Sequence, residues 1–263
     1  MEFFFGHDWL NRGLTSYAFQ WDHLLFIFLF VPLGVLLGFF LRKKDKKIVK
    51  IVMISLWAFS LIIEIIYYIT LYSICANDPV NHPFVLQSML PLHSCLAFMY
   101  VFPIAMFVKN KYIKTAANNF LVVVNMIMGF ITLFVGCPSK GYSALSTNGL
   151  QSLIYHVIIV IVPLIMLITG YYDLQKGDLK YGLALFGILA TATWIFDACT
   201  GCDYFYIYDG HTFGILYEIS ENVHHLVWTL IVDSCYIITA VIIHFSVLGI
   251  KYLINKKKKE NNV

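Results

Sequence analysis

The hexapeptide at positions 90–95, Leu-Pro-Leu-His-Ser-Cys, places an imidazole and a thiol at the start of a long apolar run. Polar and ionisable side chains are expensive inside hydrocarbon, so each one found there is a candidate functional group. Cys95 has the chemistry of a nucleophile, but a thiol in apolar surroundings holds its proton and needs a general base to become a thiolate. A thiolate of this kind can carry an acyl chain as a thioester.

The base for Cys95 is not expected to be His93. Both residues belong to the same expected helix, and their separation by two positions turns them toward nearly opposite faces. The base must then come from another helix, and His156 is the candidate, because it also lies within an apolar run. His93 would orient the substrate or polarise a carbonyl group.

The composition predicts an all-α membrane protein. Of the 263 residues, 60% are hydrophobic and 13% are charged, whereas soluble domains carry about 25% charged residues. Several apolar runs of about 20 residues are long enough to cross a bilayer as helices. The segments between them are too short to bury a soluble core. We expect no cleavable signal peptide, because acidic rather than basic residues precede the first run.

Seven membrane-spanning helices are expected, with short connections. The predicted division is a short outer segment at residues 1–23, a membrane domain at 24–250 and a basic cytoplasmic tail at 251–263. The expected helices span residues 24–41, 48–74, 89–108, 115–136, 150–170, 180–199 and 225–250.

The basic residues predict the orientation of this bundle. All but two of the 18 lysines and arginines follow the odd-numbered expected helices, and the two exceptions are Arg12 and Lys140. Because cytoplasmic loops are rich in Lys and Arg, we expect the N-terminus outside and the C-terminus inside. The sequence therefore predicts a multi-pass protein of the cell membrane.

Polar residues within the expected helices fall mostly in the outer half of the bilayer. At about 1.5 Å per residue, Cys95 and His156 both lie about 9 Å below the outer surface. Polar residues also recur at helical spacing, which indicates faces turned toward the bundle interior: Ser60, Glu64 and Tyr68, then Asn118, Asn125, Gly129 and Thr132, then Ser152 and His156. These faces predict a polar cavity open toward the outer leaflet. His244, near the inner surface, is interpreted as an interfacial side chain.

Supporting roles can be assigned to other polar residues. Glu64 could orient an imidazole, as the third member of a catalytic triad does, and Asn125 could stabilise an oxyanion. The structural alternative is that Cys95 is a small helix-packing residue and His156 a satisfied interior histidine. Three residues near the outer surface complete the candidate set: Asp197, His225 and Asp233.

The remaining cysteines carry less information. Cys199 and Cys202 form a single CxxC, which is a weak signal for zinc or redox chemistry. A disulfide between outer cysteines can form if the compartment is oxidising, and the sequence leaves its pairing open.

The order of motifs resembles the YwaF family of bacterial integral membrane proteins. The resemblance covers residues 50–250, and its most specific part is the Pro-Leu-His-x-Cys core of the hexapeptide. It also includes an outer turn at 201–206, where Cys202 and Asp203 stand in place of the family's usual Thr and Asn. The other matching residues are Glu64, Asn125, Tyr155 and His156.

The YwaF family in turn resembles a mammalian polytopic acyltransferase that places polyunsaturated chains on ether phospholipids. The mechanism suggested for that enzyme uses a cysteine and a histidine. The resemblance therefore implies a nucleophilic Cys95 and a basic His156, the same pair that depth in the membrane selects.

We expect a lipid acyltransferase that works from the outer leaflet, or a lipid-ester hydrolase if water accepts the chain. The non-enzymatic alternative is a transporter or lipid-binding membrane protein, although the sequence has none of the internal repeats typical of transporters. The expected partner is a phospholipid or another acyl lipid. No nucleic acid, cofactor or metal is expected, and protein partners are not indicated.

Overall fold

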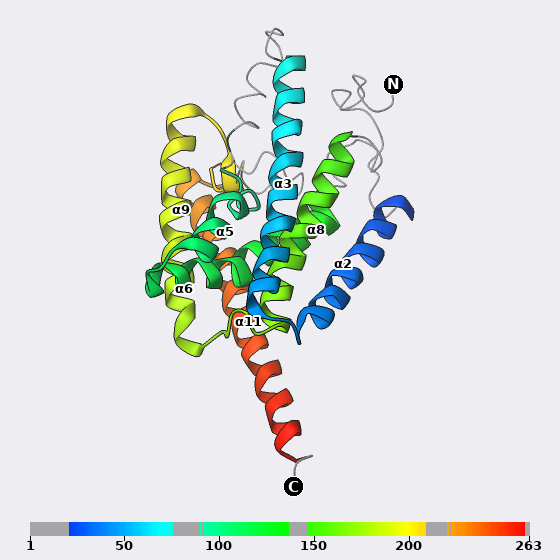
Figure 1. Ribbon diagram of the computed structural model, residues 1–263. Coiled ribbons are helices and arrows are strands. Elements are labelled where there is room, and N and C mark those ends of the chain that lie inside the picture. Colours follow the sequence, from blue (N-terminus) through cyan, green and yellow to red (C-terminus); the bar gives the residue numbers. More distant parts are fainter. Residues whose placement is uncertain are drawn as a thin grey trace.

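The computed structural model describes residues 21–75, 90, 92–136, 147–208, 220 and 222–260. All regular structure in these residues is helical, as the composition predicts (Figure 1). The α-helices are α2 (Trp21–Leu41), α3 (Lys46–Cys75), α5 (Phe98–Phe107), α6 (Lys111–Phe120), α7 (Met126–Ile131), α8 (Thr147–Ile168), α9 (Leu179–Thr200) and α11 (His225–Glu260). The shorter elements are the π-helices η2 (Leu121–Asn125) and η3 (Thr132–Gly136) and the 3₁₀ turns η5 (Lys176–Asp178) and η6 (Tyr204–Tyr206). Most of the expected outer segment 1–23 lies outside the described residues.

The third expected helix is not continuous. The described residues contain 6 helices long and apolar enough to cross a membrane, in place of the seven expected. Residues 92–97 form turns, and only the 10 residues of α5 are α-helical. Ten residues of helix extend about 15 Å, half the thickness of the hydrocarbon core. The prediction of a full helix over 89–108 is therefore wrong for its described part, and Met89 lies outside the described residues.

Burial separates the lipid face of the helices from the interior face. Large apolar side chains are exposed along three helices, as expected against lipid: Phe28, Leu36 and Phe40 of α2, Ile62 and Ile69 of α3, and Leu230, Ile238 and Ile242 of α11. The prediction that the polar residues face the interior is confirmed by the burial of Ser60, Glu64, Asn118, Asn125, Ser152 and His156.

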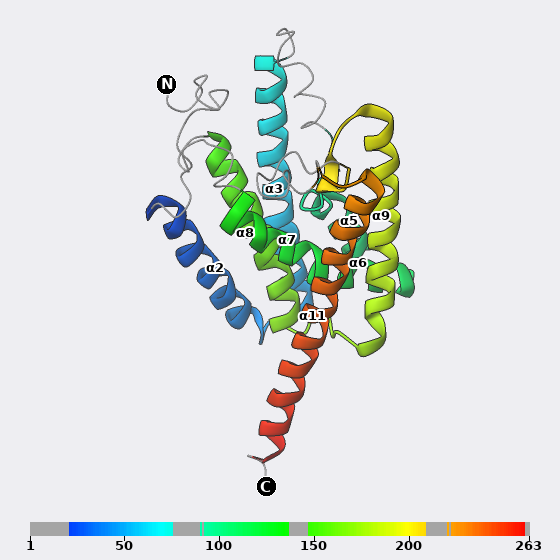
Figure 2. The same cartoon turned by 180° about the vertical axis from the view of Figure 1, so that it is seen from behind.

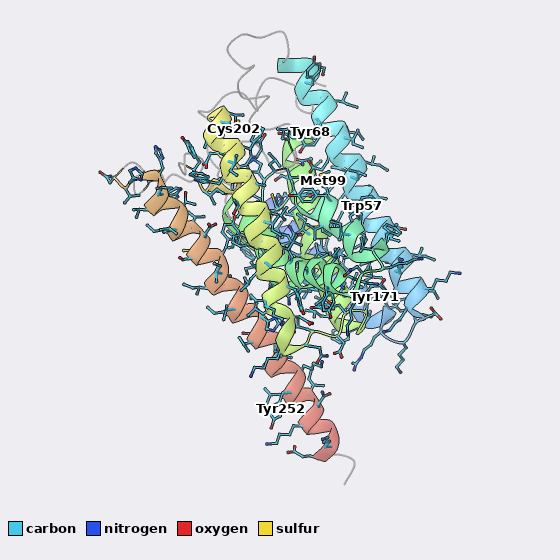
Figure 3. The ribbon with its side chains drawn as sticks, turned by 90° about the vertical axis from the view of Figure 1, so that its left-hand side faces the viewer. Trp57, Tyr68, Met99, Tyr171, Cys202 and Tyr252 are labelled. Atoms are coloured by element: carbon cyan, nitrogen blue, oxygen red, sulfur yellow. The ribbon has the colours of Figure 1, made fainter. Side chains whose placement is uncertain are left out.

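The ends of the helices sort into two sets. At one end, which we call the basic end, Lys50 donates to the carbonyl of Met106 at 2.8 Å, and Lys251 pairs with Asp173. At the other end, the Leu90 N–H donates to the Tyr204 hydroxyl at 3.3 Å. Figure 3 shows Cys202 at this second end and Tyr171 near the basic end. The chain segments predicted to be cytoplasmic thus lie together, and which end faces the cytoplasm stays a prediction.

Two side chains of α3 donate hydrogen bonds to carbonyl groups of the short helix α5 that have no donor within α5. Pro103 lies inside α5 and has no N–H to donate to the carbonyl four residues earlier, that of Met99. The indole N–H of Trp57 donates to the Met99 carbonyl instead, at 3.0 Å. Figure 3 shows the side chains of Trp57 and Met99 close together. The Lys50 ammonium group bonds to a carbonyl in the last turn of α5 in the same way.

The segment from α6 to α7 forms the centre of the bundle. Every side chain from 117 to 126 is buried, and Figure 2 shows α6 and α7 crossing the bundle at a steep angle to α9 and α11. Glycines allow the closest helix approaches: a Cβ at Gly182 of α9 would overlap the Asn119 side chain, and one at Gly34 of α2 would overlap Ile161. Small residues of this kind let membrane helices pack closely.

Candidate active site around Cys95

The turn that carries Cys95 is held by hydrogen bonds from other residues to its backbone carbonyl groups. The side-chain amide of Asn125, at the end of the π-helix η2, donates to the carbonyl of Ser94 at 2.9 Å and to that of Cys95 at 3.1 Å. Non-helical backbone within a membrane protein needs such partners, because no water is present in hydrocarbon to satisfy it. Both N–H groups of the amide are thus used, so Asn125 positions the turn, and these contacts do not support the predicted oxyanion role.

Two tyrosines complete the attachment of this turn. Tyr155 of α8 donates to the carbonyl of Cys95 at 3.4 Å, and Tyr236 of α11 donates to the hydroxyl of Ser94 at 2.9 Å. Both tyrosines are buried, whereas Cys95 is partly exposed. The structure therefore fixes the backbone of the turn, while Cys95 as a whole residue is not fully buried.

His93 lies in the same turn and packs against aromatic rings. Its ring centroid is 4.8 Å from that of Tyr204 and 5.4 Å from that of Tyr206, the second pair being stacked. Because residues 92–97 are not an α-helix, the helical geometry used to separate His93 from Cys95 does not apply. The stacking gives His93 a fixed orientation at the end of the bundle opposite the basic end.

The 3₁₀ turn η6, which packs on His93, has an unusual backbone. Phe205 and Tyr206 have φ values of 60° and 59°, in the left-handed region that aromatic residues rarely adopt. Residues held in such conformations cluster at binding and catalytic sites. Burial raises the pKa of the Tyr204 phenol above its ordinary value.

His156 lies on α8 directly after Tyr155. Its Nδ1–H donates to the carbonyl of Ser152 at 2.6 Å, which leaves the lone pair of the neutral ring on Nε2. The Tyr155 and His156 rings are nearly perpendicular to each other, in a T-shaped arrangement with centroids 5.6 Å apart. Nε2 is therefore the nitrogen of His156 that can act as a base, one residue along the helix from a tyrosine that contacts Cys95.

Glu64 is buried on α3 with 1% of its surface exposed. The side-chain amide of Gln151, at the start of α8, donates to its carboxylate. Ser60, one turn earlier on the same face, donates to the carbonyl of Trp57 at 2.7 Å. The contact with Gln151 joins Glu64 to the helix that carries His156.

The three outer candidates lie in different surroundings. Asp197 is fully buried near the C-terminal end of α9. His225 is exposed at the start of α11, where its ring stacks on Tyr208 with centroids 5.0 Å apart. Asp233 is partly buried on α11, one turn before Tyr236, and its Oδ1 has no hydrogen-bond partner among the described residues.

The interpretation of His244 as an interfacial side chain is wrong. Its ring is fully buried, and its Nδ1 accepts a hydrogen bond from the Asn119 amide at 3.2 Å. It therefore joins α11 to α6 inside the bundle. The described cysteine side chains are thiols rather than disulfides, namely Cys95, Cys199, Cys202 and Cys235, and no group of three or more metal-ligating side chains gathers in the described part of the chain.

Tyr155 and Tyr236 are the site residues whose structural roles the sequence does not predict. A tyrosine within an apolar run is an ordinary core or interface residue, so the residue type alone does not indicate a role for either tyrosine in the site. Tyr236 could have been noticed because it follows Asp233 by three positions, which puts both on one helical face.

The comparisons with known proteins identify a family. The family model described as the TMEM164 family matches residues 18–245. No curated protein and no solved structure matches the chain. The matched range includes the turn with Cys95, all of α8 and most of α11. The chain therefore belongs to the TMEM164 family.

Proposed function

We propose that the protein is a membrane-embedded lipid acyltransferase in which Cys95 is the nucleophile and His156 the general base. The observation that carries this proposal is the turn at 92–97, where Asn125 and Tyr155 hold the carbonyl groups of Ser94 and Cys95 and Cys95 itself is only partly buried. A catalytic group needs its supporting atoms locked in this way to keep a productive geometry.

The proposed reaction has two steps. In the first, Nε2 of His156 takes the proton of the Cys95 thiol, and the thiolate attacks the ester carbonyl carbon of a phospholipid. The ester C–O bond breaks, the departing lysolipid oxygen takes the proton from His156, and the acyl chain remains on sulfur as a thioester. In the second, a hydroxyl or amine gives its proton to His156 and attacks the thioester, the C–S bond breaks and the thiol is restored.

Other residues would support these steps without taking part in them. Asn125 positions the turn, and His93, which packs against Tyr204 and stacks on Tyr206, would orient the substrate headgroup. The resemblance to the YwaF family and its acyltransferase relative favours the same pair of catalytic residues. If water replaces the acceptor in the second step, the same site hydrolyses lipid esters.

The test is covalent labelling in membranes that contain the full chain. A phospholipid with an alkyne fatty acid should label the protein through a bond that hydroxylamine cleaves, and Cys95→Ala should abolish the label. His156→Gln should slow labelling by about 100-fold or more, the usual contribution of a general base. Cys199→Ala, which removes an exposed thiol away from the turn, is the matched control and should label normally.

Label that persists in Cys95→Ala would remove the covalent mechanism. The fate of the labelled chain then separates the two reactions, because an acyltransferase delivers it to a second lipid and a hydrolase releases it as free fatty acid. A normal melting temperature in detergent for each variant shows that the loss is chemical rather than structural.

A further inference from the structure

A small cavity lies at the basic end of the bundle, between the first turns of α6 and α9. Its volume is about 230 Å³, below the roughly 300 to 1,000 Å³ of pockets that hold drug-sized molecules. The lining residues are Lys111, Tyr112, Thr115, Gly177, Asp178, Lys180 and Tyr181. None of them belongs to the site around Cys95, and the proposal below does not depend on the proposed function.

The charges that line this cavity favour an anion. Lys111 and Lys180 bring two ammonium groups from different helices, against the single carboxylate of Asp178. That carboxylate is already engaged, because its Oδ2 accepts from the Tyr172 hydroxyl at 2.8 Å and from the Gln175 N–H at 2.9 Å. The lysines therefore dominate the charge that a ligand meets.

The aromatic residues hold one of these lysines in place. The Tyr112 and Tyr181 rings lie 5.7 Å apart, one on each side of the boundary between α6 and α9. The ammonium of Lys180 lies 5.0 Å from the Tyr181 ring centroid, a cation–π contact. Thr115 stands four positions after Lys111, so its hydroxyl lies on the same face of α6. Ammonium and hydroxyl groups together are donors suited to phosphate oxygens.

The depth of the cavity favours a phosphate that is attached to a lipid. The cavity lies where the membrane-spanning parts of α6 and α9 begin, and lysines and tyrosines at such positions contact the headgroup region. Ile113, next to Tyr112, is 50% exposed and offers an apolar contact for an acyl chain. We propose that this cavity binds the phosphate of an anionic phospholipid from the leaflet at the basic end.

The experiment is a lipid titration of the purified full chain in detergent, read by native mass spectrometry. The probes are dioleoyl phosphatidylglycerol, dioleoyl phosphatidylcholine and inorganic phosphate. The Lys111→Gln/Lys180→Gln double variant should bind phosphatidylglycerol at least about tenfold more weakly than the unaltered chain, since both ammonium groups that attract the anionic headgroup are removed. The Lys180→Arg variant, which keeps the charge, should retain binding.

The matched control is Lys256→Gln/Lys257→Gln, which removes two exposed charges from the far end of α11. Equal loss of binding in this control would overturn the proposal, because the effect would then come from overall charge. Phosphatidylcholine bound as tightly as phosphatidylglycerol would also overturn it. Inorganic phosphate that binds with the same affinity as the anionic lipid would overturn the assignment to a lipid, whereas phosphate that fails to displace the lipid supports it.

Discussion

At the scale of single residues, the rest of the protein holds the turn at 92–97 through the carbonyl groups of Ser94 and Cys95 and through the Ser94 hydroxyl. Asn125 and Tyr155 both reach the carbonyl of Cys95, and Tyr236 reaches the Ser94 hydroxyl. These partners come from three different segments of the bundle. Asn125 is therefore interpreted as a positioning residue, and its removal should disturb the turn before it disturbs any chemistry at the thiol.

We expect Asn125→Leu to lower the free energy of unfolding by about 1–3 kcal/mol, because the buried carbonyl of Ser94 loses its amide donor and the carbonyl of Cys95 keeps only Tyr155. Labelling of Cys95 by an alkyne-bearing lipid should slow in parallel. The melting temperature in detergent and the labelling rate measure these two effects. Asn118→Leu is the control on the same face, since the Asn118 Oδ1 has no hydrogen-bond partner among the described residues. An Asn125→Leu protein as stable as this control would contradict the positioning role.

Part of the candidate site follows from the sequence. Cys95, Glu64, Asn125 and His156 could be selected because polar groups are expensive in apolar runs, and the last three are indeed buried. The turn itself could not be predicted, because its partners lie between 30 and 142 residues away in the chain. Local periodicity carries no information about such contacts, so a segment rich in Leu and Phe was expected to be helical.

At the scale of elements, α5 shows how a short helix is held inside a membrane bundle. Its proline leaves one carbonyl without an intrahelical donor, and Trp57 of α3 supplies the missing N–H. An ordinary hydrogen bond between membrane helices contributes about 0.6 kcal/mol. A carbonyl left without a donor costs more, about 1–3 kcal/mol. We therefore use this larger value for the loss of the hydrogen bond between Trp57 and Met99.

The variant Trp57→Phe should therefore be destabilised by more than 1 kcal/mol, on the scale of about 1–3 kcal/mol for an unsatisfied buried group. It keeps an aromatic ring to stack on Phe102, whose centroid lies 6.0 Å away. Phe59→Leu, at a lipid-facing position of the same helix that is 51% exposed, should change stability little. Chemical unfolding of both variants in mixed micelles gives the comparison.

The contact between α6 and α9 gives a separate prediction. We expect Gly182→Val to be poorly folded, because the added carbons would overlap the Asn119 side chain, which also bonds to His244. Gly187→Val, on the same helix with open space around its Cα, should fold normally. Size-exclusion profiles in detergent distinguish the two outcomes. A monodisperse Gly182→Val protein would contradict the prediction, because it would show that α9 can move away from Asn119.

At the scale of the whole molecule, the two ends of the bundle differ in charge. Lysines predicted to lie on one side of the membrane meet at one end, through the contacts of Lys50 with Met106 and of Lys251 with Asp173. The placement of the basic residues therefore predicts which loops lie together, although the predicted number of membrane-spanning helices differs from the number in the structure. The count fails because an apolar run of helical length contains the turn at 92–97.

The orientation can be tested with single-cysteine proteins. Cys199 is exposed near the end of α9 away from the basic end, so a chain that keeps only this cysteine should react with a membrane-impermeable maleimide in intact cells. A chain whose only cysteine is introduced by Lys257→Cys should react only after the membrane is opened. The reverse pattern would place the basic end outside and contradict the predicted orientation.

The last helix extends beyond the others at its C-terminal end, as Figure 1 shows. Its 36 residues correspond to about 54 Å of helix, far more than the thickness of a bilayer core. A partner protein joined in helical register to residue 260 would therefore project from the micelle as a rigid arm. Such a chimera provides the asymmetric feature that image alignment in electron cryomicroscopy requires for a protein of 30.2 kDa.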